Sequence, residues 1–125
     1  MAQPAPKIIE QEPAAPAAAT IDRGHLARMT FGDRSLEREV LQLFDRQADL
    51  LLARMRDREP SAVATLAHTL KGSAASIGAT AVVQAAAAVE LAGGAAERDL
   101  AMERLAIAID AARAAIAGLL GASEG

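Results

Sequence analysis

The chain has 125 residues, enough for one domain with a modest core, and its 52% hydrophobic content includes only 2% aromatics and much alanine, which favours closely packed helices over a sheet. The absence of cysteine excludes disulfides and thiolate metal sites, and a net charge of −3 gives no electrostatic basis for binding nucleic acid. Because the sequence shows neither an apolar run near the ~18 residues of a membrane span nor the apolar core of a signal peptide, we expect a soluble, cytoplasmic protein without membrane contact.

The first 19 residues hold four of the five prolines, spaced among alanines, and this composition predicts a flexible tail at 1–19. Within the tail, the segment 7–10 (Lys-Ile-Ile-Glu) is either a short docking segment or a stray apolar pair. We expect the folded domain at 20–121 and a short C-terminal tail at 122–125.

A short first helix is predicted at 21–30, with Asp22 as its N-cap and with Leu26 and Met29 turned inward. It contains His25, to which we give no role, because a single histidine without a partner does not make a site. The residues 31–33 (Phe-Gly-Asp) then break the chain and offer a new N-cap.

The second helix is predicted at 34–58. Its apolar residues recur at helical spacing and form one buried face. They are Leu36, Val40, Leu43, Phe44, Ala48, Leu51, Leu52 and Met55. Near its C-terminus, Arg54, Arg56 and Arg58 either offset the helix dipole or form a basic rim for an acidic partner.

Three further helices are predicted at 60–77, 79–92 and 97–120. Pro60 lies in the first turn of the helix at 60–77. Glycines at 78, 93, 94 and 121 are expected to end them. Their inward residues are Val63, Leu66, Ala67, Leu70, Ala74 and Ile77, then Ala79, Val82, Ala86 and Val89, then Leu100, Met102, Leu105, Ile109, Ala112, Ile116 and Leu119. We therefore predict an all-α fold: an antiparallel four-helix bundle with an additional short N-terminal helix.

His68 lies about 140° round its helix from the centre of the apolar stripe, so its imidazole is predicted to point to solvent. The residues three, four and seven positions away share that surface, and most of them are small. They are Ser61, Ala64, Thr65, Lys71, Gly72 and Ala75. A surface without bulky side chains around a histidine indicates that another protein approaches the ring.

Gly72 and Lys71 add to this interpretation. Glycine inside a helix costs about 1 kcal/mol relative to alanine, and on the exposed side, where core packing gives no reason for it, we interpret it as room for close approach by a partner's backbone, the alternative being a tolerated imperfection. Lys71, three residues after His68, is the only lysine after Lys7, and its ammonium can reach an anion attached to the ring.

The segment 67–73 (Ala-His-Thr-Leu-Lys-Gly-Ser), followed by Gly78 and Ala79 ten and eleven residues after the histidine, resembles the signature of histidine-containing phosphotransfer (HPt) domains. The resemblance implies a four-helix bundle whose exposed histidine carries a phosphoryl group between the receiver domains of response regulators. His68 would then be the phosphoacceptor and Lys71 would stabilise the phosphoryl group. Ser61, Ala64, Thr65, Gly72 and Ala75 would line the docking surface.

Glu90 is predicted to lie beside His68. In an antiparallel hairpin that turns near residue 79, residues whose numbers sum to about 158 lie at one height, which pairs positions 68 and 90. A carboxylate there would accept the Nδ1 proton and leave the Nε2 lone pair outward. In the HPt family a Glu or Gln commonly occupies this place. The alternative is a solvated glutamate paired with an arginine.

We expect no kinase activity and no cofactor of the chain's own, because the sequence holds no glycine-rich phosphate loop and no acidic cluster for Mg²⁺. The Mg²⁺ would come from the partner receiver domain, and a hybrid histidine kinase is a further expected partner. We expect a monomer.

Two other functions are weighed against phosphotransfer. In the first, the chain is a helical-bundle adaptor and His68 is incidental, which leaves the small residues around it to chance. In the second, it is the dimerising phosphoacceptor module of a sensor kinase. Those modules usually show an acidic residue after the histidine, whereas Thr69 follows it here.

Overall fold

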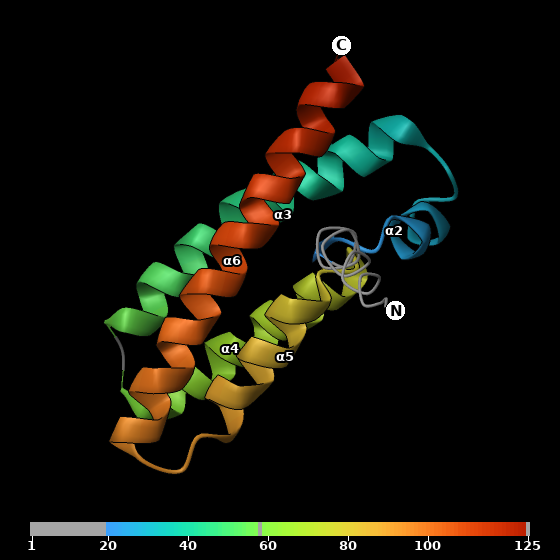
Figure 1. Cartoon of the computed structure of the whole chain (residues 1–125). Coiled ribbons are helices and arrows are strands. Elements are labelled where there is room, and N and C mark those ends of the chain that lie inside the picture. The colour runs from blue at the N-terminus through green and yellow to red at the C-terminus, as the bar shows by residue number, and fades with distance from the viewer. Residues whose placement is uncertain (1–19, 58, 125) are drawn as a thin grey trace, which may run out of the picture.

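The computed structural model describes residues 20–57 and 59–124, for 122–124 the backbone alone, and these residues fold into helices without a strand (Figure 1). The helices are α2 (Arg23–Met29), α3 (Arg34–Arg56), α4 (Pro60–Ser76), α5 (Thr80–Leu91) and α6 (Ala95–Glu124). No helix in this part of the chain is both long and apolar enough to cross a membrane. The predicted tail at 1–19, with its segment 7–10, lies outside the described residues, as does Arg58.

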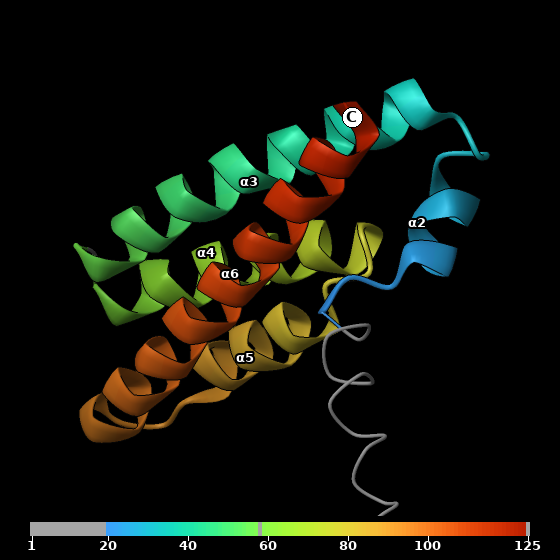
Figure 2. The same cartoon turned by 45° about the horizontal axis from the view of Figure 1, so that its top comes forward.

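The four longer helices form a closed ring in which each contacts the next along the chain and α6 returns to α3. Connections of three residues join them, so successive helices run antiparallel. The short α2 packs on α4 and lies at the end of the bundle where α4 turns into α5 (Figures 1 and 2). The start of α3 and the end of α6 extend past that turn. The predicted all-α fold is confirmed.

Local signals in the sequence begin these helices where expected. The side chain of Asp22 accepts a hydrogen bond from the backbone N–H of His25 at 3.0 Å, and Asp33 accepts one from Leu36 at 3.0 Å. Each carboxylate satisfies an otherwise unpaired donor of the first helical turn. Pro60 occupies the first turn of α4, where no backbone donor is needed.

Alanine lets the helices of the ring approach closely. Ala48, Ala67, Ala74 and Ala86, from α3, α4 and α5, have no exposed surface. Larger side chains fill the centre of the bundle, with Leu70 and Leu105 fully buried. Burial of apolar surface in this core is the main source of stability.

Gly78 fixes the turn between α4 and α5. Its φ of +75° is left-handed, its N–H donates to Ala75 O at 3.2 Å, and the N–H of Ala79 donates to Ala74 O at 2.9 Å. These two bonds form a Schellman cap with glycine at the left-handed position, as predicted. The carbonyl of Gly78 also accepts from Asp22 N at 2.9 Å, which ties the start of α2 to this turn.

Three predicted core positions are wrong: Met29, Leu43 and Leu100 are 50%, 47% and 49% exposed. Leu43 and Leu100 each lie five residues, or about 140° of helix, from the fully buried Ala48 and Leu105. Leu41 and Ala101 take the buried places instead, and Leu26 alone is buried on α2.

The predicted end of the last helix at Gly121 is also wrong, because α6 continues to Glu124. Gly121 does not have a positive φ, and no proline follows it. An interior glycine costs only about 1 kcal/mol, which does not by itself end a helix. The other helix bounds agree with the prediction within two residues.

Candidate functional site

His68 stands in the middle of α4 with 67% of its side chain exposed. The helix is oriented by Ala67, Leu70 and Ala74, which are fully buried on its opposite side. Neither the core nor the other described helices cover the imidazole, so its Nε2 is accessible to an approaching molecule.

The surface around the ring is flat. Ser61, Thr65, Gly72 and Ala75 are exposed and Ala64 is half-buried. A Cβ built on Gly72 would have no atom within 4 Å beyond the helix's own backbone and neighbours, so packing within the chain does not require glycine there. The role of these residues in docking stays a prediction.

Glu90, on α5, faces His68 across the hairpin. Its Oε2 lies 2.8 Å from the Nδ1 of the imidazole. Because an ionised carboxylate can only accept, this hydrogen bond fits the tautomer in which Nδ1 carries the proton and Nε2 keeps its lone pair. The bond thus aims Nε2 away from α5.

Lys71 contacts the same carboxylate. Its Nζ lies 2.8 Å from Glu90 Oε1, and its side chain is 32% exposed. Glu90 therefore bridges the imidazole and the ammonium, one oxygen to each, and among the described residues its ion-pair partners are these two groups rather than an arginine. The sequence pattern places Lys71 near the ring but does not predict this bridge.

The charges of the three groups are coupled. The hydrogen bond from the Lys71 ammonium, and to a smaller extent that from His68, hold the pKa of Glu90 below its ordinary value, against the opposing effect of desolvation. Glu90 is thus a carboxylate at neutral pH, which keeps it an acceptor for the Nδ1 proton.

A shallow hollow lies next to the flat surface, lined by Arg54 of α3 and by Ala62, Thr65 and Leu66 of α4. Arg54 and Arg56 stand exposed at the end of α3, with the exposed Asp57 and Glu59 next to them, so the charge here is mixed. The hollow adds apolar surface to the region around His68.

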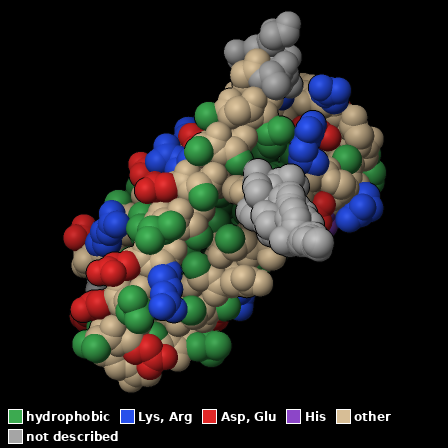
Figure 3. All heavy atoms as spheres, viewed as in Figure 1, with side chains coloured by type: hydrophobic (Ala, Val, Ile, Leu, Met, Phe, Trp, Pro, Cys, Tyr) green, Lys and Arg blue, Asp and Glu red, His purple; other side chains and the backbone are tan. Residues whose placement is uncertain are grey.

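Within the described ranges 20–57 and 59–124, no group of three His, Asp or Glu side chains is placed to hold a metal ion. On the face that α6 presents in Figure 3, Lys and Arg side chains alternate with Asp and Glu, among scattered apolar ones. Charge on that face is mixed rather than of one sign.

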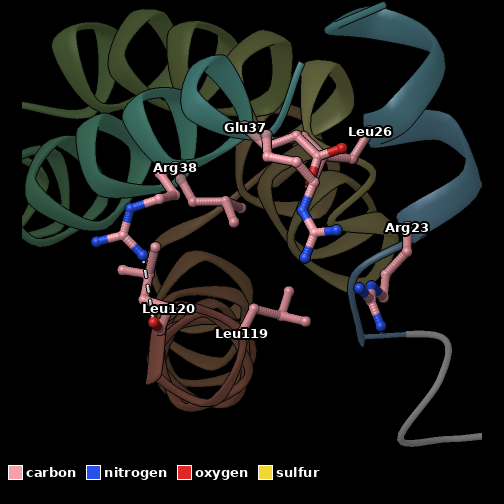
Figure 4. A pocket seen from close by; sticks show the side chains of 8 residues that line it. Arg23, Leu26, Glu37, Arg38, Leu119 and Leu120 are labelled. Carbon is pink, nitrogen blue, oxygen red and sulfur yellow. Dashed lines mark hydrogen bonds between the residues drawn. The ribbon is translucent and has the colours of Figure 1, made fainter. Parts of the chain in front are cut away.

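A second hollow lies at the end of the bundle between α2, the start of α3 and the end of α6 (Figure 4). Arg23, Leu26, Leu119 and Leu120 help to line it, and Arg38 donates a hydrogen bond across it to Leu120 O at 3.3 Å. The sequence contains no signal for it, because residues far apart in the chain form it. None of the predicted site residues lines it.

The family model of the Hpt domain matches residues 35–119, from the second residue of α3 into the last turns of α6. The chain therefore belongs to the Hpt domain family, as its motif suggests. Hpt domains are phosphocarrier modules of phosphorelay signalling rather than kinases, and they interact with the receiver domains of response regulators. No curated protein and no solved structure matches the chain.

Proposed function

We propose that this protein is a phosphorelay intermediate that accepts a phosphoryl group on His68 from the aspartyl phosphate of one receiver domain and passes it to the aspartate of another. The observation that carries the proposal is an exposed imidazole whose Nδ1 is held by Glu90, on the helix that bears the family's motif. Family membership supports phosphotransfer in general, and this geometry favours His68 as the acceptor.

The transfer step needs no base other than the ring itself. The Nε2 lone pair forms a bond to phosphorus while the bond from phosphorus to the aspartyl oxygen breaks, and the carboxylate leaves with that electron pair. No proton has to leave Nε2, because the neutral ring carries its proton on Nδ1. The ring becomes positively charged, and the carboxylate 2.8 Å away offsets this charge.

Lys71 is the residue we expect to stabilise the bound phosphoryl group. Its long side chain starts one helical turn from His68, and its ammonium lies on Glu90 when the ring is unmodified. A phosphoryl group on Nε2 offers stronger acceptor oxygens than a shared carboxylate, so the ammonium moves to it. Glu90 then keeps the ring oriented through the hydrogen bond to Nδ1.

The remaining charge neutralisation comes from the partner. Phosphoryl transfer from an aspartyl phosphate uses a Mg²⁺ ion, which the receiver domain supplies in this proposal, so the chain has no cofactor of its own. A receiver docks as a transient partner of the monomer on the flat surface of Ser61, Ala64, Thr65, Gly72 and Ala75, and a hybrid histidine kinase is one source of such a receiver.

Labelled transfer tests this function. Receiver domains from the same genome are phosphorylated with acetyl phosphate bearing labelled phosphorus, and each is incubated with the full chain. We expect label that is acid-labile and stable in alkali, as phosphohistidine is, and no label on a His68→Gln variant that keeps the helical circular dichroism of the wild type. Label on His68→Gln, or no transfer from any receiver of the genome, would overturn the proposal.

A further inference from the structure

Two helices of this chain end in the same backbone motif with different residues at its strained position. At the end of α2, Phe31 N donates to Arg28 O at 3.4 Å and Gly32 N donates to Ala27 O at 2.8 Å. These bonds form a Schellman cap like the one at the end of α4. The left-handed residue of the α4 cap is Gly78, whereas that of the α2 cap is Phe31, with φ of +57°.

Phenylalanine at this position costs free energy, because its Cβ crowds the following carbonyl in the left-handed conformation. Contacts within the described chain do not repay that cost, since Phe31 is 91% exposed. The neighbouring Thr30 is 2% exposed and donates its hydroxyl to Leu26 O at 2.8 Å, so the turn itself is firmly held. A strained backbone with an exposed aromatic ring indicates a function outside the chain.

Other large apolar side chains are also exposed, among them Leu91 (79%) and Ile107 (69%). Both lie in helices with ordinary backbone geometry, and scattered exposed residues of this kind are normal. Phe31 differs because its conformation is unfavourable for the residue that occupies it. It is also one of only two aromatic residues in the chain.

A continuous surface leads from His68 to this turn. Along α4, Gly72 and Ala75 lie one and two turns beyond His68, and seven residues of helix span about 10 Å. Ala75 and Gly78 then share a hollow with His25 of α2 and with Asp22, the N-cap of that helix.

Along α2 the surface continues to Phe31. Met29, four residues after His25, is on the same side of α2 and is 50% exposed. Phe31 lies two residues after Met29, just past the end of the helix.

We infer that Phe31, together with the exposed Met29 two residues before it, is a second anchor for the receiver domain that docks at His68. The inference rests on the proposed function. A single domain of 100–150 residues has a radius of gyration of about 13–15 Å, so a receiver seated on His68 reaches across the turn of α4 to α2. Aromatic side chains near an interface supply much of its binding energy, and this one adds affinity without touching the phosphoryl group.

The charges around Phe31 are mixed. Arg28 and Arg34 are exposed, and Asp22 and Asp33 keep their negative charge although their carboxylates accept the N-cap hydrogen bonds. The apolar ring rather than net charge is therefore the feature that a receiver would bind.

Replacement of Phe31 by glycine separates binding from stability. Phe31→Gly removes the ring and relieves the left-handed strain, so we expect the melting temperature of the full chain to rise by about 4 °C or more. With the phosphorylated receiver that loads His68 fastest, we expect about a tenfold increase in KM and a kcat within twofold of the wild type. The Phe31→Tyr variant keeps both the aromatic ring and the left-handed strain, so its KM should equal that of the wild type.

Ile107→Ala is the matched control, since it removes an exposed apolar side chain from α6 and should change neither constant. A Phe31→Gly variant with the wild-type KM would overturn the inference, whatever its melting temperature. A failure of the proposed function is distinguishable, because the wild-type chain would then accept no label from any receiver.

Discussion

The Oε2 of Glu90 lies 2.8 Å from the Nδ1 of His68, although twenty-two residues separate them in the chain. The hairpin of α4 and α5 brings them to one height, and the second oxygen of the carboxylate is held by Lys71 at 2.8 Å. The three side chains form one unit in which a carboxylate holds the ring and the ammonium. In the proposed function this ammonium would move to the phosphoryl group. Each part of this unit can be changed separately.

Glu90→Ala should slow phosphotransfer to His68 by about tenfold, because the ring loses the acceptor that fixes its tautomer and orientation. Glu90→Gln keeps a side-chain oxygen for the Nδ1 proton and should retain more activity than alanine. Nitrogen chemical shifts of the His68 ring check the cause, since the wild type and Glu90→Gln should favour the Nδ1–H tautomer more than Glu90→Ala. Equal transfer rates for all three proteins would exclude a positioning role.

Lys71→Met should raise the pKa of Glu90 towards the ordinary value of 4.5, because the hydrogen bond from the Lys71 ammonium is the largest cause that lowers it. Carbon NMR of the glutamate carboxyl groups, titrated from pH 7 to pH 2, measures this change directly. Arg104→Met is a suitable control, since Arg104 is an exposed residue of α6. A Glu90 carboxyl that titrates identically in wild type and Lys71→Met would contradict the observed bridge.

The lowered pKa of Glu90 also makes the stability of the fold depend on pH. A carboxyl group whose pKa is lower in the folded than in the unfolded state stabilises the fold when the pH is above its pKa in the unfolded state. This contribution is lost as the pH falls through its pKa in the folded state. The contribution of Glu90 is therefore complete at neutral pH and is lost below about pH 4.5. Urea unfolding at pH 7 and pH 3 should show a smaller acid-induced loss in Lys71→Met than in the wild type.

Gly72→Arg should slow transfer from the receiver by about tenfold or more while the fold is retained. The position is open, since a Cβ there meets no atom within 4 Å beyond the helix's own backbone and neighbours, so the new side chain obstructs only a partner. Gly72→Ala is the control and should stabilise the chain by about 1 kcal/mol with a smaller effect on transfer. If Gly72→Arg accepts phosphoryl groups at the wild-type rate, the flat surface is not the docking site.

Much of this site can be predicted from the sequence because helical geometry is regular. The spacing of apolar residues places His68 on the outer side of its helix, and counting from a turn near residue 79 pairs its height with Glu90. Lys71 shows the limit of such reasoning: helical spacing places its Cα, but a long side chain has several rotamers, and its contact with Glu90 Oε1 depends on the neighbouring helix.

The core and the caps show a second limit. Leu43 and Leu100 are apolar residues whose position on the helix leaves them exposed, and hydrophobicity alone does not reveal this. The sequence at 31–33 predicts a break in the chain and a new N-cap, but not which residue caps α2. In the structure Phe31 is the capping residue, with Gly32 one position later and also at positive φ (+73°).

Gly78→Ala should destabilise the chain by about 2 kcal/mol or more, because two independent constraints meet at this residue. Its φ of +75° disfavours any side chain, and a Cβ there would lie 2.8 Å from both the Cβ and the carbonyl oxygen of Asp22. Relief of that clash would break the hydrogen bond from Asp22 N to Gly78 O and loosen α2. Gly118→Ala, at an open position within α6, should instead stabilise by about 1 kcal/mol. Urea unfolding monitored by circular dichroism compares the two variants, and equal midpoints would show that the turn does not depend on glycine.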